Sequence, residues 1–194
     1  MKLRGLYAIT PDGSGVVDKV RQALEGGIAL LQYRRKNPES PEEARALLAL
    51  ARRHGVPFIV NDDVGLALEL GADGVHLGRE DGDLAVARGK LKGKLLGASC
   101  YDRLDLAQAA LAAGADYIAF GSVFPSPTKP SATRASLSLF RNDLEKPVCA
   151  IGGITLQNAP QVIAAGADMV AVISDLFDAP DIARQAAAYG NLFS

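Results

Sequence analysis

The sequence has little cysteine, and this shortage excludes two classes of stabilised fold. Only Cys100 and Cys149 occur in 194 residues, far apart and without a Cys-x-x-Cys or Cys/His cluster. Neither a disulfide framework nor a zinc site is therefore expected. Both thiols are predicted to be small core residues.

An excess of charge of one sign is missing as well. The chain has 21 Lys and Arg against 22 Asp and Glu, which gives a formal net charge of -1. No global field recruits nucleic acid or an anionic membrane, so any anion must be held by local groups. The sequence thus predicts small-molecule partners, no nucleic acid and no membrane, and it leaves a monomer and a homo-oligomer both open.

Long apolar segments are also absent. The start, MKLRGLYAIT, has no signal-peptide core. No run approaches the ~20 apolar residues needed to span a bilayer, so a cytoplasmic location is expected. With 48% hydrophobic residues, a chain of 194 residues can bury one sizeable core, and residues 1–194 are predicted to form one domain.

The clearest pattern that is present is an internal repeat. Gly-Ala-Asp occurs three times, in LGADGVHLG, AGADYIAFG and AGADMVAVIS, each time after an Ala/Leu-rich stretch with helical spacing. The glycines are expected to end helices in the left-handed conformation. The aspartates, Asp73, Asp116 and Asp168, are expected to make local turn hydrogen bonds and to have no catalytic role. The repeating unit is a helix, a Gly stop and a buried strand.

The strand pattern predicts the fold class. Eight apolar runs bounded by turn residues lie at 6–10, 29–33, 58–61, 74–77, 95–99, 117–121, 148–151 and 169–172, with helical patterns between them. Such alternation implies parallel pairing and right-handed crossovers. Eight units predict an α/β fold of the (β/α)8 TIM barrel type, in a compact form. An open doubly wound sheet is the alternative, although no Gly-x-Gly-x-x-Gly follows the first run.

Charged side chains collect after these predicted strands, at the end of a barrel where catalytic residues lie. Asp62 and Asp81 follow neighbouring strands, which lie ~4.8 Å apart in a parallel sheet, so the two carboxylates could share one hard cation. Mg²⁺ fits best, because it binds one or two carboxylates and takes its other ligands from water and phosphate. Donors and positive charge that suit a diphosphate come from Gln32, Arg34, Lys36 and Lys129.

A second anion site is predicted elsewhere on the barrel. Gly152 and Gly153 follow the seventh predicted strand and Ser174 follows the eighth. These are the common phosphate-binding positions of this fold, where backbone N–H groups can approach a dianion closely. The pattern indicates a second phosphate group, separate from the metal.

His76 lies inside the fourth predicted strand. A buried histidine in a strand is more often hydrogen-bonded within the core than used as a base or a ligand. We therefore expect a structural role for His76.

The motifs of the chain, taken in order, resemble the thiamine-phosphate synthase family, also called thiamine-phosphate pyrophosphorylase. They are LYAIT, QYRRK, ND, GVHLGRED, GAS, FPSPTK, IGGI and VIS, and they cover nearly the whole sequence. The resemblance implies a transferase of thiamine biosynthesis. Such an enzyme couples hydroxymethylpyrimidine diphosphate with thiazole phosphate by dissociative displacement of pyrophosphate, with Mg²⁺ as cofactor.

The same resemblance implies a role for individual residues. Hydroxymethylpyrimidine diphosphate would contact Gln32, Tyr33, Arg34, Arg35, Lys36, Asn61, Ser99 and Lys129. The implied catalytic residues among these are Arg34, Lys36, Ser99 and Lys129. Magnesium would bind Asp62 and Asp81. The thiazole phosphate would contact Ser126, Pro127, Thr128, Gly152, Gly153, Ile173 and Ser174.

Three positions depart from the family pattern. Ser126 replaces the usual Thr, which predicts a modest effect on acceptor binding. Arg35 and Arg79 stand where an acidic residue and Gln are more common, and we expect them to add positive charge around the diphosphate and to affect turnover.

Two alternatives to the synthase remain, a thiazole tautomerase of the TenI type and a non-catalytic barrel that binds thiamine precursors. The tautomerases typically have a histidine where this chain has Ser122, and they typically lack the equivalents of Asp62 and Lys129. Neither alternative needs a metal-diphosphate site, so the sequence favours the synthase.

Overall fold

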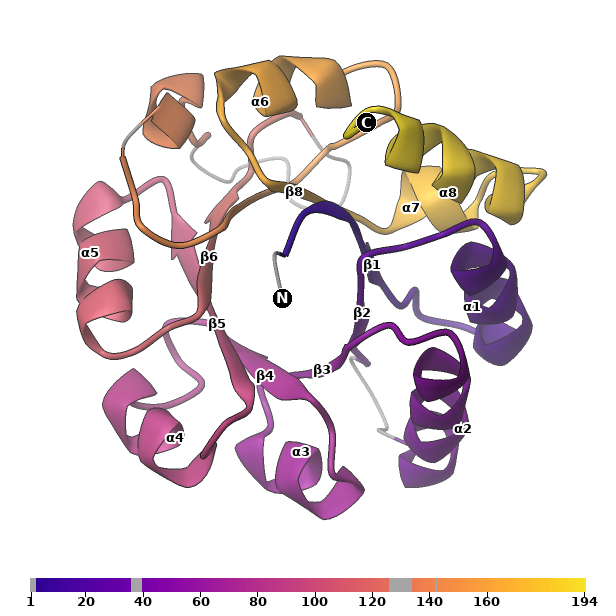
Figure 1. The fold of residues 1–194 in the computed structure, drawn as a ribbon, viewed down its shortest axis with the longest axis horizontal. Helices are drawn as coiled ribbons and strands as arrows, with labels where there is room; N and C mark the ends of the chain where they lie inside the picture. Colours follow the sequence, from indigo (N-terminus) through magenta and orange to yellow (C-terminus); the bar gives the residue numbers. More distant parts are fainter. Residues whose placement is uncertain (1–2, 36–39, 126–133, 142) are drawn as a thin grey trace.

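The computed structural model of the chain describes residues 3–35, 40–125, 134–141 and 143–194. Within these ranges the strands form a closed barrel in the order β1 to β8, and β8 pairs with β1 (Figure 1). Every neighbouring pair is parallel. The strands are β1 (Gly5–Ile9), β2 (Leu30–Tyr33), β3 (Phe58–Asn61), β4 (Gly74–Leu77), β5 (Leu95–Tyr101), β6 (Tyr117–Gly121), β7 (Val148–Ile151) and β8 (Met169–Val172).

Helices surround the barrel as an outer ring (Figure 1). The α-helices are α1 (Val16–Glu25), α2 (Pro41–Arg53), α3 (Val64–Leu70), α4 (Leu84–Lys90), α5 (Leu104–Ala112), α6 (Ala159–Ala165), α7 (Ser174–Phe177) and α8 (Ile182–Asn191). The described part of the connection from β6 to β7 contains a 3-10 helix, η1 (Leu137–Arg141), in place of an α-helix. The predicted TIM barrel is confirmed, and the strand bounds agree with the predicted runs to within two residues.

Helix α2 shows how local sequence sets these elements. The Ser40 side chain accepts a hydrogen bond from the Glu43 N–H at 3.2 Å, and Pro41 takes the first turn, where its missing N–H costs nothing. Acidic residues lie in the first turn of the helix and basic residues in the last, as the helix dipole favours. This start places Glu43 beside the end of β2.

The apolar residues form two separate cores. One lies inside the barrel, where inward residues of the strands such as Tyr7, Ile59 and Met169 pack together. The larger one lies between the barrel and the helices. It includes Phe58 and Val60 and the residues through which α1 and α8 contact one another. Alternate strand residues therefore face different cores, as the period of two in a β-strand requires. Cys100 and Cys149 are buried and free, as predicted.

The aspartates of the Gly-Ala-Asp repeats do not make the predicted local turn hydrogen bonds. Each precedes a strand and accepts a hydrogen bond from the N–H of the residue that opens, or nearly opens, the neighbouring strand. The expectation failed because this partner lies 15 to 20 residues earlier in the chain and is adjacent only in the barrel. The bonds run from Phe58 to Asp73 at 2.8 Å, from Leu96 to Asp116 at 2.8 Å and from Val148 to Asp168 at 3.0 Å.

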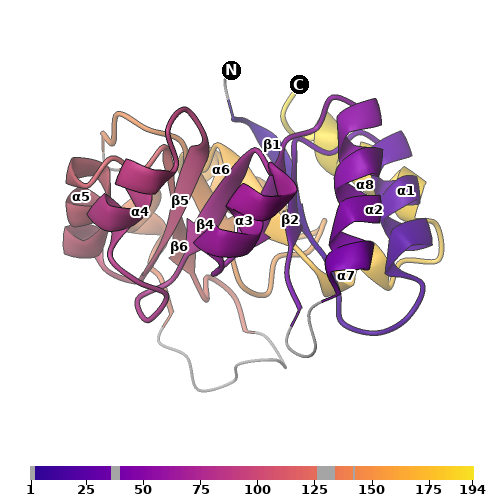
Figure 2. The same cartoon turned by 90° about the horizontal axis from the view of Figure 1, so that it is seen from below.

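These aspartates mark the end of the barrel at which the strands begin. The start of the described chain and its C-terminus lie at that end, opposite the ends of the strands (Figure 2). Among the described residues, no helix is both long and apolar enough to span a bilayer.

Candidate functional site

The C-terminal ends of the strands concentrate backbone strain. The described residues other than glycine that adopt a positive φ are Asp62 at 64°, Tyr101 at 53° and Ser122 at 57°. Asp62 and Ser122 directly follow β3 and β6, and Tyr101 ends β5. Such conformations are uncommon for residues with a Cβ, and they gather at functional sites that the surrounding fold holds in place. This end of the barrel is therefore the candidate active site.

Two carboxyl groups meet there. Asp62 follows β3, and the Asn61 amide Nδ2 donates a hydrogen bond to its Oδ2 at 2.5 Å. Asp81 lies in the loop after β4, and its Oδ2 accepts a hydrogen bond from the Gly78 N–H at 2.7 Å. Partial burial, and then contact with the Asp81 carboxyl and its charge, raise the pKa of Asp62 to about 6. The fold thus brings together the two residues that the sequence predicts as metal ligands.

The donor set fits magnesium. The Asp81 carboxyl contributes to the raised pKa of Asp62, and a divalent cation bound between the two carboxyls would offset this effect. Within the described ranges, no group of three or more His, Cys, Asp or Glu side chains could hold a metal. Two protein carboxylates suit Mg²⁺, because it keeps water and phosphate oxygens as its other ligands. A cavity of about 360 Å³ adjoins the pair and is lined by Asp62, Asp81, Asp83 and Lys90 among others.

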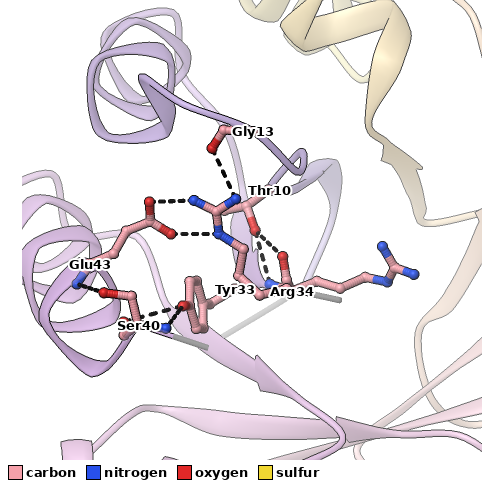
Figure 3. A network of polar contacts seen from close by, with 7 residues as sticks. Thr10, Gly13, Tyr33, Arg34, Ser40 and Glu43 are labelled. Atoms are coloured by element: carbon pink, nitrogen blue, oxygen red, sulfur yellow. Dashed lines mark hydrogen bonds and ion pairs between the residues drawn. The ribbon is translucent and has the colours of Figure 1, made fainter. Parts of the chain in front are cut away.

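Arg34 is a cation whose charge acts on the Asp62 carboxyl. Its backbone is fixed by Thr10, whose hydroxyl donates to the Arg34 carbonyl oxygen at 2.9 Å and accepts from the Arg34 N–H at 2.9 Å (Figure 3). Its charge counteracts part of the rise in the pKa of Asp62. Across the part of the chain that the structure describes, Arg34 forms no ion pair. Its guanidinium is therefore available for an anion.

Arg35 has a different environment from Arg34. Its Nε donates to Glu43 Oε1 at 2.7 Å, its Nη2 to Glu43 Oε2 at 2.5 Å, and its Nη1 to the Gly13 carbonyl oxygen at 2.9 Å (Figure 3). The hydrogen bond with Glu43 raises the pKa of Arg35. The predicted additional positive charge at the diphosphate site is thus paired with a carboxylate of α2.

Tyr33 also faces α2. Its ring is buried against Phe58 in the outer core, and its hydroxyl donates to the Ser40 carbonyl oxygen at 3.2 Å. The side chains of Tyr33 and Arg35 are thus both directed to the segment at α2, and the contacts of these two residues with the diphosphate stay predictions. Alternation along β2 turns the Gln32 side chain into the barrel and the Tyr33 side chain out of it.

The turn after β7 begins with two glycines in the left-handed region. Gly152 and Gly153 have φ angles of 99° and 65°, a region that favours glycine. A Cβ on Gly153 would lie 2.4 Å from the Pro125 carbonyl oxygen, so the turn packs directly against the segment after β6. Asn158 holds the turn, because its Nδ2 donates to the Gly153 carbonyl oxygen at 2.9 Å. Ser174, which follows Ile173 after β8, is exposed and opens α7.

A buried chain of polar side chains crosses the barrel interior, and the sequence did not predict it. It links Gln32 on β2 with Ser99 on β5 through two tyrosines and His76. Gln32 Nε2 donates to the Tyr7 hydroxyl at 2.7 Å, and the Tyr7 and Tyr117 hydroxyls lie 2.7 Å apart. The Tyr117 hydroxyl lies 3.1 Å from His76 Nδ1, and His76 Nε2 lies 2.9 Å from Ser99 Oγ. Two residues predicted to contact substrate are thus connected through the core.

Burial keeps this chain uncharged. Desolvation lowers the pKa of His76 to about 4 and raises the pKa values of Tyr7 and Tyr117 above their ordinary range. The sequence does contain a signal for this chain, because polar residues occur at inward-facing positions of otherwise apolar strands. Which positions face inward is known only once the pairing register of the strands is known. The predicted role of His76 as a hydrogen-bonded core residue is confirmed.

Comparison with known proteins agrees with this arrangement. A family model described as thiamine monophosphate synthase matches residues 6–176. The chain belongs to the thiamine monophosphate synthase family. A thiamine-phosphate synthase of Aromatoleum aromaticum is 57% identical, with 99% of this chain and 97% of that protein covered. One from Thioalkalivibrio sulfidiphilus is 55% identical, with 99% and 96% covered.

Two solved structures of other proteins share the fold. A thiamine phosphate pyrophosphorylase from Pyrococcus furiosus is 36% identical and has a TM-score of 0.89, with 99% of this chain and 96% of that chain covered. A 3-hexulose-6-phosphate synthase has a TM-score of 0.74 at 16% identity, a likeness of fold alone. The predicted family, TIM barrel and transferase class are confirmed.

Some predicted site residues of this thiamine monophosphate synthase family member lie outside the described residues. They are Lys36, Ser126, Pro127, Thr128 and Lys129. Arg79, the other additional cation, lies over the exposed Tyr101 ring at 5.1 Å from the centroid. Arg79 belongs to the loop that also carries Asp81, and its effect on the diphosphate stays a prediction.

Proposed function

We propose that the chain couples hydroxymethylpyrimidine diphosphate with thiazole phosphate, with Mg²⁺, to give thiamine phosphate and pyrophosphate. The observation that carries the proposal is the meeting of the Asp62 and Asp81 carboxyls beside Arg34. A metal-bound diphosphate needs both a divalent-cation site and a cation that is not already paired. The confirmed family and transferase class support the same activity.

Asp62 and Asp81 would hold the magnesium. When bound, this ion supplies positive charge that stabilises the departing diphosphate. Asn61 supports the site by donating to the Asp62 carboxylate, and the Gly78 N–H does the same for Asp81. These contacts orient both carboxylates before any ligand arrives.

The remaining diphosphate contacts are proposed on the same side of the barrel. Arg34 would bind a terminal oxygen, and Gln32, Asn61 and Ser99 would contribute polar contacts from the strand ends. Tyr33 and Arg35 would contribute only backbone groups, because their side chains are bonded to the segment at α2. Lys36 and Lys129 are assigned to the diphosphate by resemblance to the family.

The acceptor phosphate is proposed to lie at the other anion position. Backbone N–H groups of Gly152 and Gly153 and the exposed Ser174 hydroxyl would bind it. By resemblance, Ile173 and the segment from Ser126 through Pro127 to Thr128 complete that site. Two sites of different construction allow two anions to bind together without competing.

The reaction then needs no general base. The carbon–oxygen bond between the methylene group and the diphosphate breaks, and its electron pair leaves with pyrophosphate. The lone pair of the thiazole nitrogen forms the new carbon–nitrogen bond and leaves a thiazolium cation. The protein contributes by orienting both substrates and by stabilising the leaving group. His76 is consistent with this scheme, because its low pKa and its buried partners make it unsuited to act as a base.

The proposal is tested by mixing both substrates with Mg²⁺ and measuring thiamine phosphate and pyrophosphate together. Equal amounts of the two products are expected, and neither should form without Mg²⁺. A protein that binds both substrates without turnover would be a precursor-binding barrel. A protein that only isomerises the thiazole would be a tautomerase.

A further inference from the structure

The buried chain from Gln32 to Ser99 joins five strands through the middle of the barrel. Its two ends are residues assigned to the diphosphate substrate, whereas Tyr7, Tyr117 and His76 are buried and are not among the assigned substrate contacts. The two tyrosine hydroxyls lie 110 residues apart in sequence but 2.7 Å apart in space. Polar groups so deep in an apolar core are costly unless each one is hydrogen-bonded, and here each one is.

The direction of the chain follows from counting protons. The Gln32 amide nitrogen can only donate, so the Tyr7 oxygen accepts from it. A tyrosine hydroxyl has one proton, and the Tyr7 proton must therefore go to its other partner, Tyr117. By the same rule the Tyr117 proton goes to His76 Nδ1. A neutral imidazole that accepts at Nδ1 carries its proton on Nε2, which then donates to Ser99 Oγ.

We infer that this chain sets the hydrogen-bonding polarity of both of its ends, and that Tyr7, Tyr117 and His76 are positioning residues. Ser99 accepts from His76, so its own proton is directed to the substrate as a donor. Gln32 uses its nitrogen inside the barrel, so its carbonyl oxygen is left as an acceptor. The inference rests on the proposed function for the identity of the ligands.

This polarity matches the proposed donor substrate. A diphosphate oxygen is an acceptor and needs the Ser99 hydroxyl proton, while an amino group on the pyrimidine can donate to the Gln32 carbonyl oxygen. The opposite direction of the chain would point Ser99 lone pairs at the anion and Gln32 N–H groups at the amine. Because each hydroxyl has one proton, Ser99 and Gln32 can exchange their donor and acceptor roles toward the substrate only together.

Gly97 on β5, between the strands of His76 and Tyr117, leaves room for the chain. An added Cβ on Gly97 would lie 2.2 Å from Tyr117 Cζ and 2.5 Å from His76 Nδ1. The bond between Tyr117 and His76 thus occupies the space that a side chain at this position would fill. Gly97 lies two residues before Ser99 on β5, so it faces the same interior. A side chain there would separate Tyr117 from His76 and interrupt the chain.

Nitrogen-15 NMR of the resting protein measures the direction without any substrate. The chain has two histidines, His54 and His76, and His76→Gln assigns the signals. We expect His76 at neutral pH to be protonated at Nε2 and unprotonated at Nδ1. An Nδ1–H tautomer would mean that the chain runs the other way and would overturn the inference, as would a doubly protonated ring.

Variants test the effect on substrate. Tyr117→Phe removes the donor to His76 and should raise the KM for the pyrimidine diphosphate roughly 3-fold to 10-fold, the usual effect of losing one hydrogen bond between uncharged groups. The KM for the thiazole phosphate should stay unchanged, and the His76 tautomers should become mixed. Tyr7→Phe should act in the same direction but less strongly, because it is one bond further from Ser99.

Tyr189→Phe is the matched control. Tyr189 is also buried, and its hydroxyl donates to Asp175 Oδ2 at 2.7 Å, away from the chain. It should lose a similar amount of stability while both KM values and the His76 tautomer stay as in the wild type. If Tyr117→Phe behaves like Tyr189→Phe, the tyrosines of the chain are merely structural and the inference is wrong.

Rescue by a conservative variant separates positioning from packing. His76→Gln can still present an N–H donor to Ser99, whereas His76→Leu cannot. The glutamine variant should retain substantially more affinity for magnesium pyrophosphate than the leucine variant, and equal losses in two folded variants would contradict the inference. If the wild type shows the Nε2–H tautomer but forms no thiamine phosphate, the proposed function fails while the polarity of the chain stands.

Discussion

The two ends of the barrel use the same residue type in opposite ways. Where the strands begin, Asp73, Asp116 and Asp168 each accept a hydrogen bond from a backbone N–H of the neighbouring strand. Where the strands end, Asp62 and Asp81 face one another, and the pKa of Asp62 rises to about 6. The first group connects neighbouring strands, while the second places two carboxyl groups where a cation could bind.

The difference shows where this fold places stability and where it places chemistry. At the end where the strands begin, each carboxylate has a donor and none of the described non-glycine residues has a positive φ. At the other end, backbone strain and adjacent like charges occur together. Stability is thus sacrificed locally at the end where ligands bind, as in other TIM barrels. Substitutions at each end of the barrel should therefore affect different properties, activity at one end and stability at the other.

The largest expected effect is on activity at the carboxylate pair. Asp62→Asn and Asp81→Asn should each lower kcat/KM by at least about 100-fold. Loss of a residue that only supports a metal ligand typically costs about 10-fold to 100-fold, and loss of a ligand itself should cost more. Asp63→Asn is the control, because it removes a neighbouring charge while an amide oxygen can still cap α3. The variants should also need more Mg²⁺. Wild-type rates at low Mg²⁺ in either variant would refute the metal assignment.

A stability loss without an activity loss is expected at the opposite end. Asp168→Ala leaves the Val148 N–H without its partner and should lower the free energy of unfolding by about 1–3 kcal/mol. Denaturant titration measures this change, with Glu145→Ala as the exposed carboxylate control. The remaining folded enzyme should keep its kcat. A marked loss of kcat in Asp168→Ala would show that the two ends are not separate in function.

A smaller effect is expected at the acceptor position. Ser174→Ala should raise the KM for thiazole phosphate by roughly 3-fold to 10-fold, the effect of losing one hydrogen bond. The KM for the pyrimidine diphosphate serves as the internal control and should not change. Gly153→Val is a less clean test, because its Cβ would lie 2.4 Å from the Pro125 carbonyl oxygen and disturb the fold. Equal increases in both KM values would contradict two separate anion sites.

The smallest effect is a gain in stability from Asp62→Asn without metal. Above pH 6 the raised pKa of Asp62 destabilises the folded state, because the unfolded carboxyl ionises freely at 3.8. As the pH falls through 6, the folded carboxyl takes up a proton, and the penalty disappears below about 4. Solvent screening limits the gain to under ~1 kcal/mol, or about 2–4 °C in Tm. Calorimetry at pH 7.5 should show this gain, and at pH 4 it should vanish.

Sequence predicted most of the fold because the strands are short apolar runs between turn residues. The bounds of β3, β4, β6, β7 and β8 agree with the predicted runs. The end of β5 was predicted two residues early, since the chain shifts register between Ser99 and Tyr101 and then continues to pair with β6. A register shift depends on the neighbouring strand, so the pattern of β5 alone does not contain it.

The candidate site was predictable where position along a strand decides it. Asp62 and Asp81 lie together because parallel strands end at the same side of the barrel. The pairing of Arg35 with Glu43 was not predictable, because it depends on where α2 returns to the barrel. The chain through Tyr7, Tyr117 and His76 was missed for a related reason: its partners meet only when the barrel closes.

The central claim is that Asp62 and Asp81 together hold the metal of a diphosphate site. The most direct test is calorimetric titration of Mg²⁺ into the protein in the presence of inorganic pyrophosphate. We predict binding in the wild type and in Asp63→Asn, and a loss of most Mg²⁺ affinity in Asp62→Asn and in Asp81→Asn. Unchanged Mg²⁺ affinity in either of the last two variants, measured on folded protein, would contradict the account.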